Sequence, residues 1–183
     1  MKDSDYRVNP EENPDLNGEI QRSLVLFKPD AVQRGIVGEI LTRFERLGLK
    51  IVGVKMLEPG EEHYYKHYED ISKLISRRSQ DAFEAVLEFM TLGPVIAMVF
   101  EGVEAVPVIR KIVGSTEPRS AQPGTIRGDY AHISFSYANP RKKSIPNLIH
   151  ASGNLAEAKE EIALWFAENE LFNYEDLSDR YTR

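Results

Sequence analysis

A chain of 183 residues with 42% hydrophobic and 28% charged side chains is long enough for one domain with a full core. The absence of cysteine excludes disulfides, thiolate metal sites and a cysteine nucleophile, and it suits the reducing cytoplasm, which is the location we expect. A formal net charge of −6 argues against binding of nucleic acid or an anionic membrane by the whole surface, while a local basic pocket for a small polyanion remains compatible with it.

The first third of the chain predicts a flexible arm and two strands with a helix between them. Residues 1–22 are polar and acidic, which is typical of a flexible arm. Residues 23–27 form a continuous apolar run that predicts a buried strand, and Pro29 ends it because proline has no amide donor. The apolar spacing over 36–47 is helical, and the β-branched residues of 49–57 favour a second strand.

The middle of the chain continues this alternation of helices and strands. Residues 61–70 look helical and carry two histidines and three tyrosines, which we interpret as a surface helix with a few buried aromatic side chains. Ser79 is placed to cap a following helix with an apolar face. The uninterrupted apolar run 95–100 predicts the central strand, and the pattern over 105–113 predicts a short helix.

The last third contains a long loop and a predicted hairpin. Regular periodicity vanishes over 114–129, and a loop of that length in a compact domain usually has a function. Residues 130–137 alternate like a strand and 144–149 like its return, which predicts an added hairpin with a basic tip. An amphipathic helix follows over 154–168, and the C-terminal tail, 171–183, shows no clear periodicity. This order of elements predicts an α+β fold in which helices cover a single sheet.

His150 stands at the centre of the predicted chemistry. The stretch Asn147-Leu148-Ile149-His150-Ala151-Ser152 leads from a short apolar run into small residues, which leave room beside the ring for a substrate. Imidazole is the side chain that most readily acts as a nucleophile or proton carrier near neutral pH. His150 is therefore our candidate nucleophile, and the alternative is a hydrogen-bonded structural histidine.

Basic and hydrogen-bonding residues at strand ends and in the long loop predict an anion site around this histidine. Arginine matches phosphate oxygens with a planar fork, and lysine supplies a compact charge. No nearby motif offers a carboxylate cage, so magnesium, if used, should arrive mainly on the phosphates of a ligand. The residues of this predicted anion site are Lys28, Arg110, Thr116, Arg127 and Asn147.

Glu161 adds a carboxylate to the predicted site. It falls on the same helical line as Asn154, Ala158 and Trp165, at the border of the buried face. A carboxylate there can accept a hydrogen bond from one imidazole nitrogen of His150, which would fix the tautomer and leave the other nitrogen free to attack. The alternative for Glu161 is a surface ion pair.

Four further signals of the chain are the motifs Lys28-Pro29-Asp30-Ala31-Val32-Gln33-Arg34-Gly35, Gly93-Pro94-Val95, Pro123-Gly124-Thr125-Ile126-Arg127-Gly128-Asp129 and Asn147-Leu148-Ile149-His150-Ala151-Ser152. Together they resemble the nucleoside diphosphate kinase family. They follow one another in the family's order, and the resemblance covers about residues 23–170. The chain has neither a P-loop nor the glycine loop of protein kinases, so it would handle nucleoside triphosphates by another route.

The resemblance implies a fold, an assembly and an activity. The fold would be a ferredoxin-like αβ sandwich with a four-stranded antiparallel sheet, assembled into a homo-oligomer, either a hexamer or a tetramer. The activity would be transfer of the γ-phosphate of ATP to nucleoside diphosphates, by a ping-pong mechanism through a phosphohistidine at His150. Such a reaction maintains nucleoside triphosphate pools and uses Mg2+ as its cofactor.

The resemblance also implies roles for individual residues. Tyr68 matches a tyrosine beside the histidine, Ser152 the serine just after it, and Glu161 the glutamate that orients the ring. The residues that match those holding the phosphates and the sugar are Lys28, Arg110, Thr116, Arg127 and Asn147.

Some features depart from the family's pattern. Ala82 stands where members often stack a phenylalanine on the base, and Phe83 matches that residue's apolar neighbour. Base stacking is then either weaker here or supplied by another side chain. Gly153 stands where many members have aspartate, and the connections 73–79 and 130–146 are longer than usual. These longer connections would either change the oligomer or cover the site.

Two other functions are compatible with the same fold. One is a catalytically silent nucleotide-binding or assembly module, for which Ala82 and the longer connections are the support. The other is an RNA-binding ferredoxin-like domain, whose sheet should display aromatic residues among basic ones. The strands predicted here carry aliphatic residues and the chain is acidic, so we expect neither nucleic acid nor a membrane as a partner.

Overall fold

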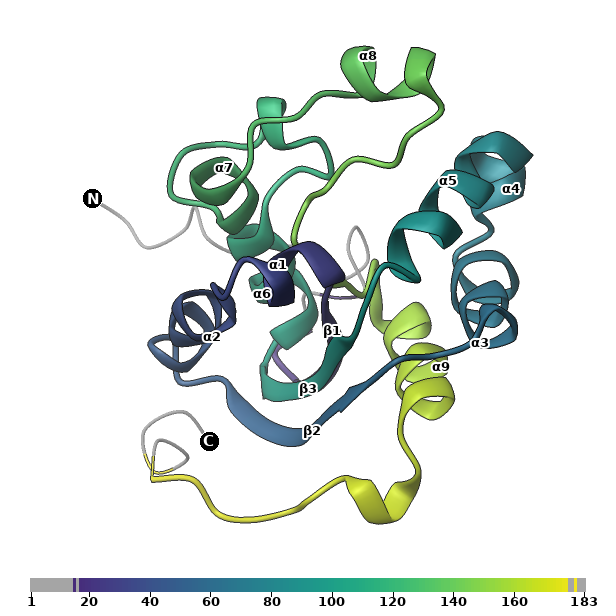
Figure 1. The fold of residues 1–183 in the computed structure, drawn as a ribbon. Helices are drawn as coiled ribbons and strands as arrows, with labels where there is room; N and C mark the ends of the chain where they lie inside the picture. Colours follow the sequence, from purple (N-terminus) through teal and green to yellow (C-terminus); the bar gives the residue numbers. More distant parts are fainter. Residues whose placement is uncertain (1–14, 16, 178–179, 181–183) are drawn as a thin grey trace.

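A single four-stranded antiparallel sheet, in the order β2-β3-β1-β4, organises the described part of the chain (Figure 1). The computed structural model describes residues 15, 17–177 and 180, so most of the predicted N-terminal arm and the end of the predicted tail lie outside the described residues. The strands are β1 (Ile20–Phe27), β2 (Lys50–Leu57), β3 (Val95–Val103) and β4 (Ile149–Ala151). The sheet with its helices confirms the predicted α+β, ferredoxin-like class.

β1 lies in the interior of the sheet and is buried on both faces. Because side chains alternate along a strand, Val25 and Phe27 enter one apolar core and Leu24 and Leu26 the other. The first core is covered by α2 (Val37–Glu45) and α6 (Ala105–Val113), and the second by α3 (Glu61–Tyr65), α5 (Gln80–Met90) and α9 (Leu155–Trp165). With both faces covered over its central strands, the described sheet offers no aromatic platform for RNA.

The remaining elements are short and lie mostly around one end of the sheet. Helix α5 begins as predicted, because the hydroxyl of Ser79 accepts the amide hydrogen of Ala82 at 3.1 Å. β1 begins at Ile20, three residues earlier than predicted. The other helices are α1 (Pro29–Gln33), α4 (Leu74–Arg77), α7 (Ile126–Tyr130) and α8 (Phe135–Ala138), with a π-helical turn at Lys66–Ile71 and 3-10 turns at Pro118–Ser120, Asn139–Arg141 and Glu168–Glu170.

The hairpin predicted over 130–149 was wrong. The segment contains the end of α7, then α8 and a 3-10 turn, and only Ile149–Ala151 pairs as a strand. Ser134 caps α8 by accepting the amide hydrogen of Tyr137, so its hydroxyl supports a helical turn where alternation suggested a ladder. A segment with alternating apolar and polar residues forms a strand only where it can pair with a strand edge, and the described segment pairs with none before β4.

The chain after α9 crosses one face of β2. The amide of Phe172 donates to the carbonyl of Val52 at 2.7 Å, and the hydroxyl of Tyr174 donates to the carbonyl of Ile51 at 2.7 Å. The described part of the predicted tail therefore docks on the sheet. Within the described ranges, none of the helices has the length and apolar character needed to span a membrane.

Candidate active site

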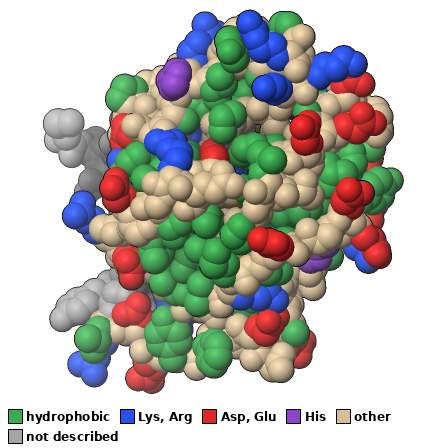
Figure 2. Space-filling model, viewed as in Figure 1, with side chains coloured by type: hydrophobic (Ala, Val, Ile, Leu, Met, Phe, Trp, Pro, Cys, Tyr) green, Lys and Arg blue, Asp and Glu red, His purple; other side chains and the backbone are tan. Residues whose placement is uncertain are grey.

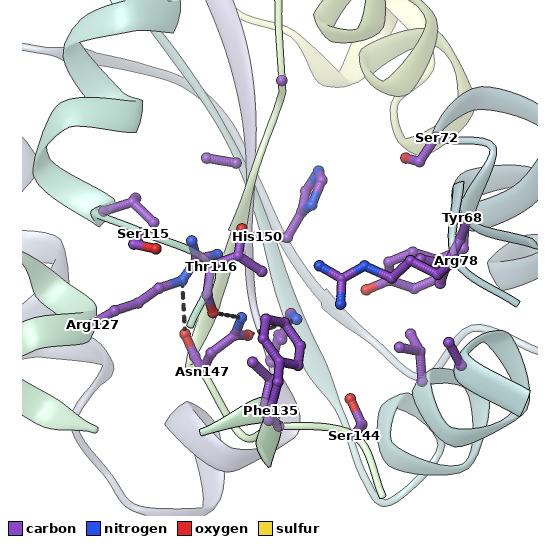
Figure 3. A pocket seen from close by; sticks show the side chains of 18 of the residues that line it. Tyr68, Ser72, Arg78, Ser115, Thr116, Arg127, Phe135, Ser144, Asn147 and His150 are labelled. Atoms are coloured by element: carbon purple, nitrogen blue, oxygen red, sulfur yellow. Dashed lines mark hydrogen bonds between the residues drawn. The ribbon is translucent and has the colours of Figure 1, made fainter. Parts of the chain in front are cut away.

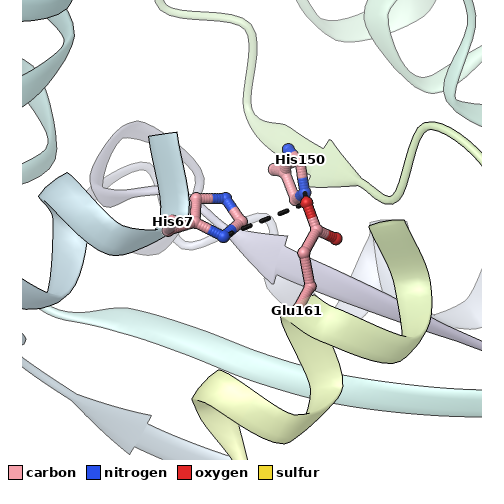
Figure 4. A group of neighbouring side chains, drawn as sticks. All are labelled: His67, His150 and Glu161. Atoms are coloured by element: carbon pink, nitrogen blue, oxygen red, sulfur yellow. Dashed lines mark hydrogen bonds and ion pairs between the residues drawn. The ribbon is translucent and has the colours of Figure 1, made fainter. Parts of the chain in front are cut away.

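His150 lies at the middle of β4, where it pairs with Leu26 of β1. Its side chain is 16% exposed, and its Nε2 atom lies 2.9 Å from Oε1 of Glu161. Figure 4 shows the second ring nitrogen on the side of the ring away from that carboxylate. The predicted contact between these two side chains is therefore present, and Nδ1 is the nitrogen left for chemistry.

Glu161 is fully buried on α9 and is held between two hydrogen-bond donors. Ser152 donates its hydroxyl hydrogen to Oε2 at 2.6 Å, while Oε1 faces His150. Burial alone raises the pKa of Glu161, but the neighbouring His150 and these hydrogen bonds outweigh it and lower the pKa to about 2. A carboxylate that stays ionised keeps the proton of His150 on Nε2, which leaves a lone pair on Nδ1.

His67 is a second histidine of the site, and sequence reasoning had placed it only among the aromatic residues of a surface helix. Its ring meets that of His150 edge to face, with centroids 4.6 Å apart, and Trp165 donates its indole hydrogen to Nδ1 at 3.2 Å. Burial, followed by the nearby His150, lowers the pKa of His67 to about 3, so the ring is neutral. The π-helical turn Lys66–Ile71 turns both His67 and Tyr68 inward.

These contacts decide between a metal centre and a hydrogen-bonded network. His67, His150 and Glu161 have potential ligand atoms within 4.8 Å of one another (Figure 4). Nδ1 of His67 is already used by Trp165, and both oxygens of Glu161 have donors. We therefore interpret the group as a network that positions His150.

Lys28 and Arg127 bring two buried cations to the same place. Lys28, at the end of β1, donates from Nζ to Oδ1 of Asn147 at 2.8 Å. Arg127, on α7, donates to the carbonyl oxygens of Gly114 at 2.9 Å and Ile149 at 2.6 Å, so it also ties the long loop to β4. Figure 3 shows Arg127, Asn147 and His150 around one pocket.

The electrostatics of these cations favour an anionic ligand. Burial and then the charge of Arg127 lower the pKa of Lys28 to about 8. Burial and then the charge of Arg110 lower the pKa of Arg127 to about 10. Both pKa shifts mean that desolvation and repulsion between the cations disfavour these positive charges in the folded protein. A bound polyanion would offset the desolvation and the repulsion.

The backbone between Asn147 and His150 is strained. Leu148 is fully buried with φ of 71°, a left-handed conformation that costs a non-glycine residue roughly 1–3 kcal/mol. The side chain of Asp30 accepts the amide hydrogen of Leu148 at 3.0 Å, and the carbonyl oxygen of Leu148 accepts the amide hydrogen of Lys28 at 2.9 Å. The segment after Phe27 thereby fixes the backbone that carries Asn147 and His150, a role for Asp30 that sequence reasoning missed.

The pocket above His150 has a volume of about 770 Å³. Seven of the predicted site residues line it, and Arg110 and Thr116 do so as exposed side chains. Ser152 and Glu161 do not line it, since they lie buried beneath the imidazole. The seven lining residues are Lys28, Tyr68, Arg110, Thr116, Arg127, Asn147 and His150.

Sequence reasoning missed several residues on the pocket wall, among them Arg78 and Phe135. Both lie in the longer connections, and length alone was the signal that could have pointed to them. The described lining contains five cations and a single carboxylate, that of Glu157. Such a wall does not cage a divalent cation, and it fits one that arrives on the phosphates of a ligand.

Comparisons with known proteins identify a family for this arrangement. The family model for nucleoside diphosphate kinase matches residues 21–171. The nucleoside diphosphate kinase of Borreliella burgdorferi is 46% identical over 157 residues, covering 85% of this chain and 92% of that protein. That of Pyrococcus furiosus is 44% identical over 165 residues, covering 90% and 94%.

Solved structures agree with these relatives. A transition-state mimic of the nucleoside diphosphate kinase from Borrelia burgdorferi, with bound vanadate and ADP, superposes with a TM-score of 0.86 at 44% identity, over 89% of this chain and 96% of that one. The halophilic nucleoside diphosphate kinase of Halobacterium salinarum in complex with CDP gives a TM-score of 0.74 at 36% identity, over 89% and 98%.

Proposed function

The chain belongs to the nucleoside diphosphate kinase family and transfers phosphate between nucleotides through a phosphohistidine, and from this premise we propose that His150 is the histidine that carries the phosphate. Nδ1 attacks the γ-phosphorus of a nucleoside triphosphate, the bond to the bridging oxygen breaks, and the nucleoside diphosphate leaves. A second nucleoside diphosphate then attacks the phosphohistidine, which restores the imidazole and completes the ping-pong cycle.

The buried network supports the nucleophile. Glu161 holds the Nε2 proton of His150, accepts from Ser152, and compensates the positive charge that the ring gains when Nδ1 is phosphorylated. His67, being neutral, packs against the ring without competing for that charge. Tyr68 packs on His67, with centroids 4.6 Å apart, and lines the pocket. Together these contacts hold the imidazole in one orientation, which is the form of catalysis that positioning supplies.

The cations of the pocket bind and stabilise the phosphates. Lys28 and Arg127 lie beside His150 and face the charge that develops on the transferring group, while the exposed Arg110 and Thr116 reach the remaining phosphates. Asn147 accepts from Lys28 and is placed to bind the sugar. A divalent cation takes part in catalysis in this family, and we infer that it is Mg2+, which when bound to the phosphates neutralises part of their charge.

The observation that carries this assignment is the free nitrogen of a positioned imidazole beside two buried cations. Incubation of the full chain with radiolabelled ATP and Mg2+ should leave an acid-labile phosphate on the protein, and His150→Ala should leave none. His132→Ala serves as the matched control, because His132 is exposed and is not among the pocket residues. Labelling of the His150→Ala protein at the wild-type level would show that another residue carries the phosphate.

We also infer that the chain forms a homo-oligomer, a hexamer or a tetramer, and that it acts in the cytoplasm, where nucleoside triphosphates are regenerated. β2 is an edge strand of the sheet, and Val54 and Met56 on it are each 59% exposed. Figure 2 shows hydrophobic side chains gathered on the face where Figure 1 places β2. The part of β2 around Val54 and Met56, beyond the chain end docked at Ile51 and Val52, is suited to pairing with another chain.

A further inference from the structure

The pocket wall combines side chains of two kinds. Lys28, Arg127 and His150 form its charged part, which suits phosphates. At another part of the wall, α5 contributes only small or aliphatic side chains, those of Ala82, Ala85 and Val86. An amphiphilic ligand with a charged and a planar apolar part fits such a cavity, but α5 itself provides no ring for the planar part.

Phe135 is the aromatic residue on the wall that the buried network does not use. It is half-buried at the start of α8, within the longer connection after α7. Its backbone is fixed, since its amide donates to Oε1 of Glu117 at 2.9 Å, and the amide of Arg119 donates to the carbonyl of Ile133 at 3.2 Å. The ring is thus tied to the loop that also carries Thr116, on the phosphate side of the pocket.

The two longer connections meet across the pocket at this ring. The guanidinium of Arg78, just before α5, lies 4.4 Å from the centroid of Phe135. Lys142, in the same connection as Phe135, forms an ion pair at 3.2 Å with Asp81 in the first turn of α5. In Figure 3 Arg78 and Phe135 point toward each other over the pocket. Because the ion pair is exposed, it contributes little, and the contact between the guanidinium of Arg78 and the ring of Phe135 is the main interaction that holds the two connections together.

We propose that Phe135 provides the surface on which the nucleotide base stacks, with Arg78 fixing the orientation of its ring, an assignment that rests on the proposed nucleotide kinase function. The base stacks on the face of Phe135 that Arg78 does not cover, near the small side chains of α5, and the phosphates extend toward His150. Stacking on an aromatic face tolerates every base, because each has a π-face, so this arrangement is compatible with a broad choice of nucleoside diphosphates. The longer connections therefore contribute to substrate binding.

The test compares a nucleotide with the same ligand lacking its base. Calorimetric titration of the full chain gives Kd for GDP and for ribose 5-diphosphate. Phe135→Ala and Phe135→Leu should weaken GDP binding by roughly 5- to 150-fold, the range of one lost base–aromatic stack, and change ribose 5-diphosphate binding by less than about two-fold. Phe135→Trp should retain GDP binding. The Leu variant keeps apolar packing, so a loss seen in both Ala and Leu reports the missing ring.

Tyr137→Ala provides the matched control. Tyr137 is an exposed aromatic residue of the same segment, with Arg141 4.0 Å from its ring centroid, and it is not among the pocket residues. The Tyr137→Ala variant should leave the Kd values for GDP and ribose 5-diphosphate unchanged. Equal losses for GDP and ribose 5-diphosphate, or wild-type GDP binding by Phe135→Leu, would overturn the proposal. These titrations need no turnover, so a failure of the wild-type chain to form a phosphohistidine counts against the proposed function separately.

Discussion

At the residue scale, the site depends on charges that the fold holds in unfavourable places. Lys28 and Arg127 are each 8% exposed and repel each other, and the pKa of each is lowered by burial and by a neighbouring arginine. Such strain is useful in an anion site, because the bound phosphates return the cations to a favourable environment.

Nucleotide binding should therefore depend on the protonation of Lys28. Its pKa is about 8 in the folded protein against 10.5 ordinarily, and a bound polyanion favours the charged form, so binding above pH 8 is coupled to proton uptake. Kd for ADP, measured by calorimetry, should increase toward about tenfold per pH unit as the pH rises above 8. Lys28→Met should bind weakly at neutral pH and lose this pH dependence. An affinity of the wild-type chain that is constant from about pH 7 to 9.5 would contradict this account.

Glu161 should act on kcat more than on substrate binding. Glu161→Gln preserves size but removes the charge that balances the phosphorylated ring, and its amide cannot accept from both His150 and Ser152. We expect kcat to fall by roughly 100-fold with a small change in KM, the magnitude typical of a lost proton-positioning group. Glu160→Gln, an exposed neighbour on the same helix, is the control and should be unchanged. Equal steady-state parameters for both variants would remove Glu161 from the mechanism.

Sequence reasoning found residues of the site that lie where a predicted strand ends. Lys28 follows a buried strand and precedes a proline, His150 precedes a series of small residues, and both features are local. His67 and Phe135 escaped because their roles come from contacts across elements, with His150 in one case and with Arg78 in the other. No spacing along the chain encodes those contacts.

At the element scale, the predictions succeeded for elements whose apolar pattern reflects burial, and they failed for a strand whose formation depends on pairing with another strand. The apolar run of β1 and the periodicity of α6 are each properties of one segment. α6 has the predicted bounds, and β1 ends where expected but begins three residues earlier. Alternation over 130–137 indicated a strand, but a strand needs a partner edge, and a capped turn at Ser134 formed instead. The π-helical turn at Lys66–Ile71 was also unpredictable, since it follows from packing two adjacent side chains inward.

The docking of the chain end on β2 depends on one glycine. A Cβ atom at Gly53 would lie 2.9 Å from Cδ2 of Leu171 and 3.1 Å from Cε1 of Phe166, which leaves no room for a side chain. Gly53→Val should lower the free energy of unfolding by about 1–3 kcal/mol, measured by urea denaturation. Gly38→Ala, on α2 with nothing within 4 Å of the added Cβ, should be neutral or stabilising. Equal stability of the two variants would show that the docked segment moves aside freely.

At the scale of the whole molecule, the sheet has two edge strands, and the chain end covers part of one of them, β2, at Ile51 and Val52. β4 closes one side of the sheet beside the site, whereas β2 ends it on the other with exposed Val54 and Met56. The family resemblance predicted a homo-oligomer, and we propose the exposed part of β2 as the surface through which it forms. The symmetry and number of copies are properties of contacts between chains, which no pattern within one chain contains.

A charge on the open edge should weaken assembly. Met56→Lys places a lysine on the β2 edge, the device by which natural sheets prevent pairing between edges. Sedimentation equilibrium should give a mass above that of one chain for the wild type and a lower mass for Met56→Lys. Leu92→Lys is the control, because Leu92 is 60% exposed but lies outside every strand. A wild type that sediments as a single chain, or a variant of unchanged mass, would exclude this surface.

The hydrogen bond from Trp165 to His67 has a practical consequence. The sequence contains one tryptophan, and its indole is bonded to a ring that itself touches His150. Excited indole responds to charge in its surroundings, and phosphorylation of His150 adds the negative charge of a phosphoryl group to that neighbouring ring. The intrinsic tryptophan fluorescence of this protein should therefore change in each half-reaction, which would allow both to be followed without a label.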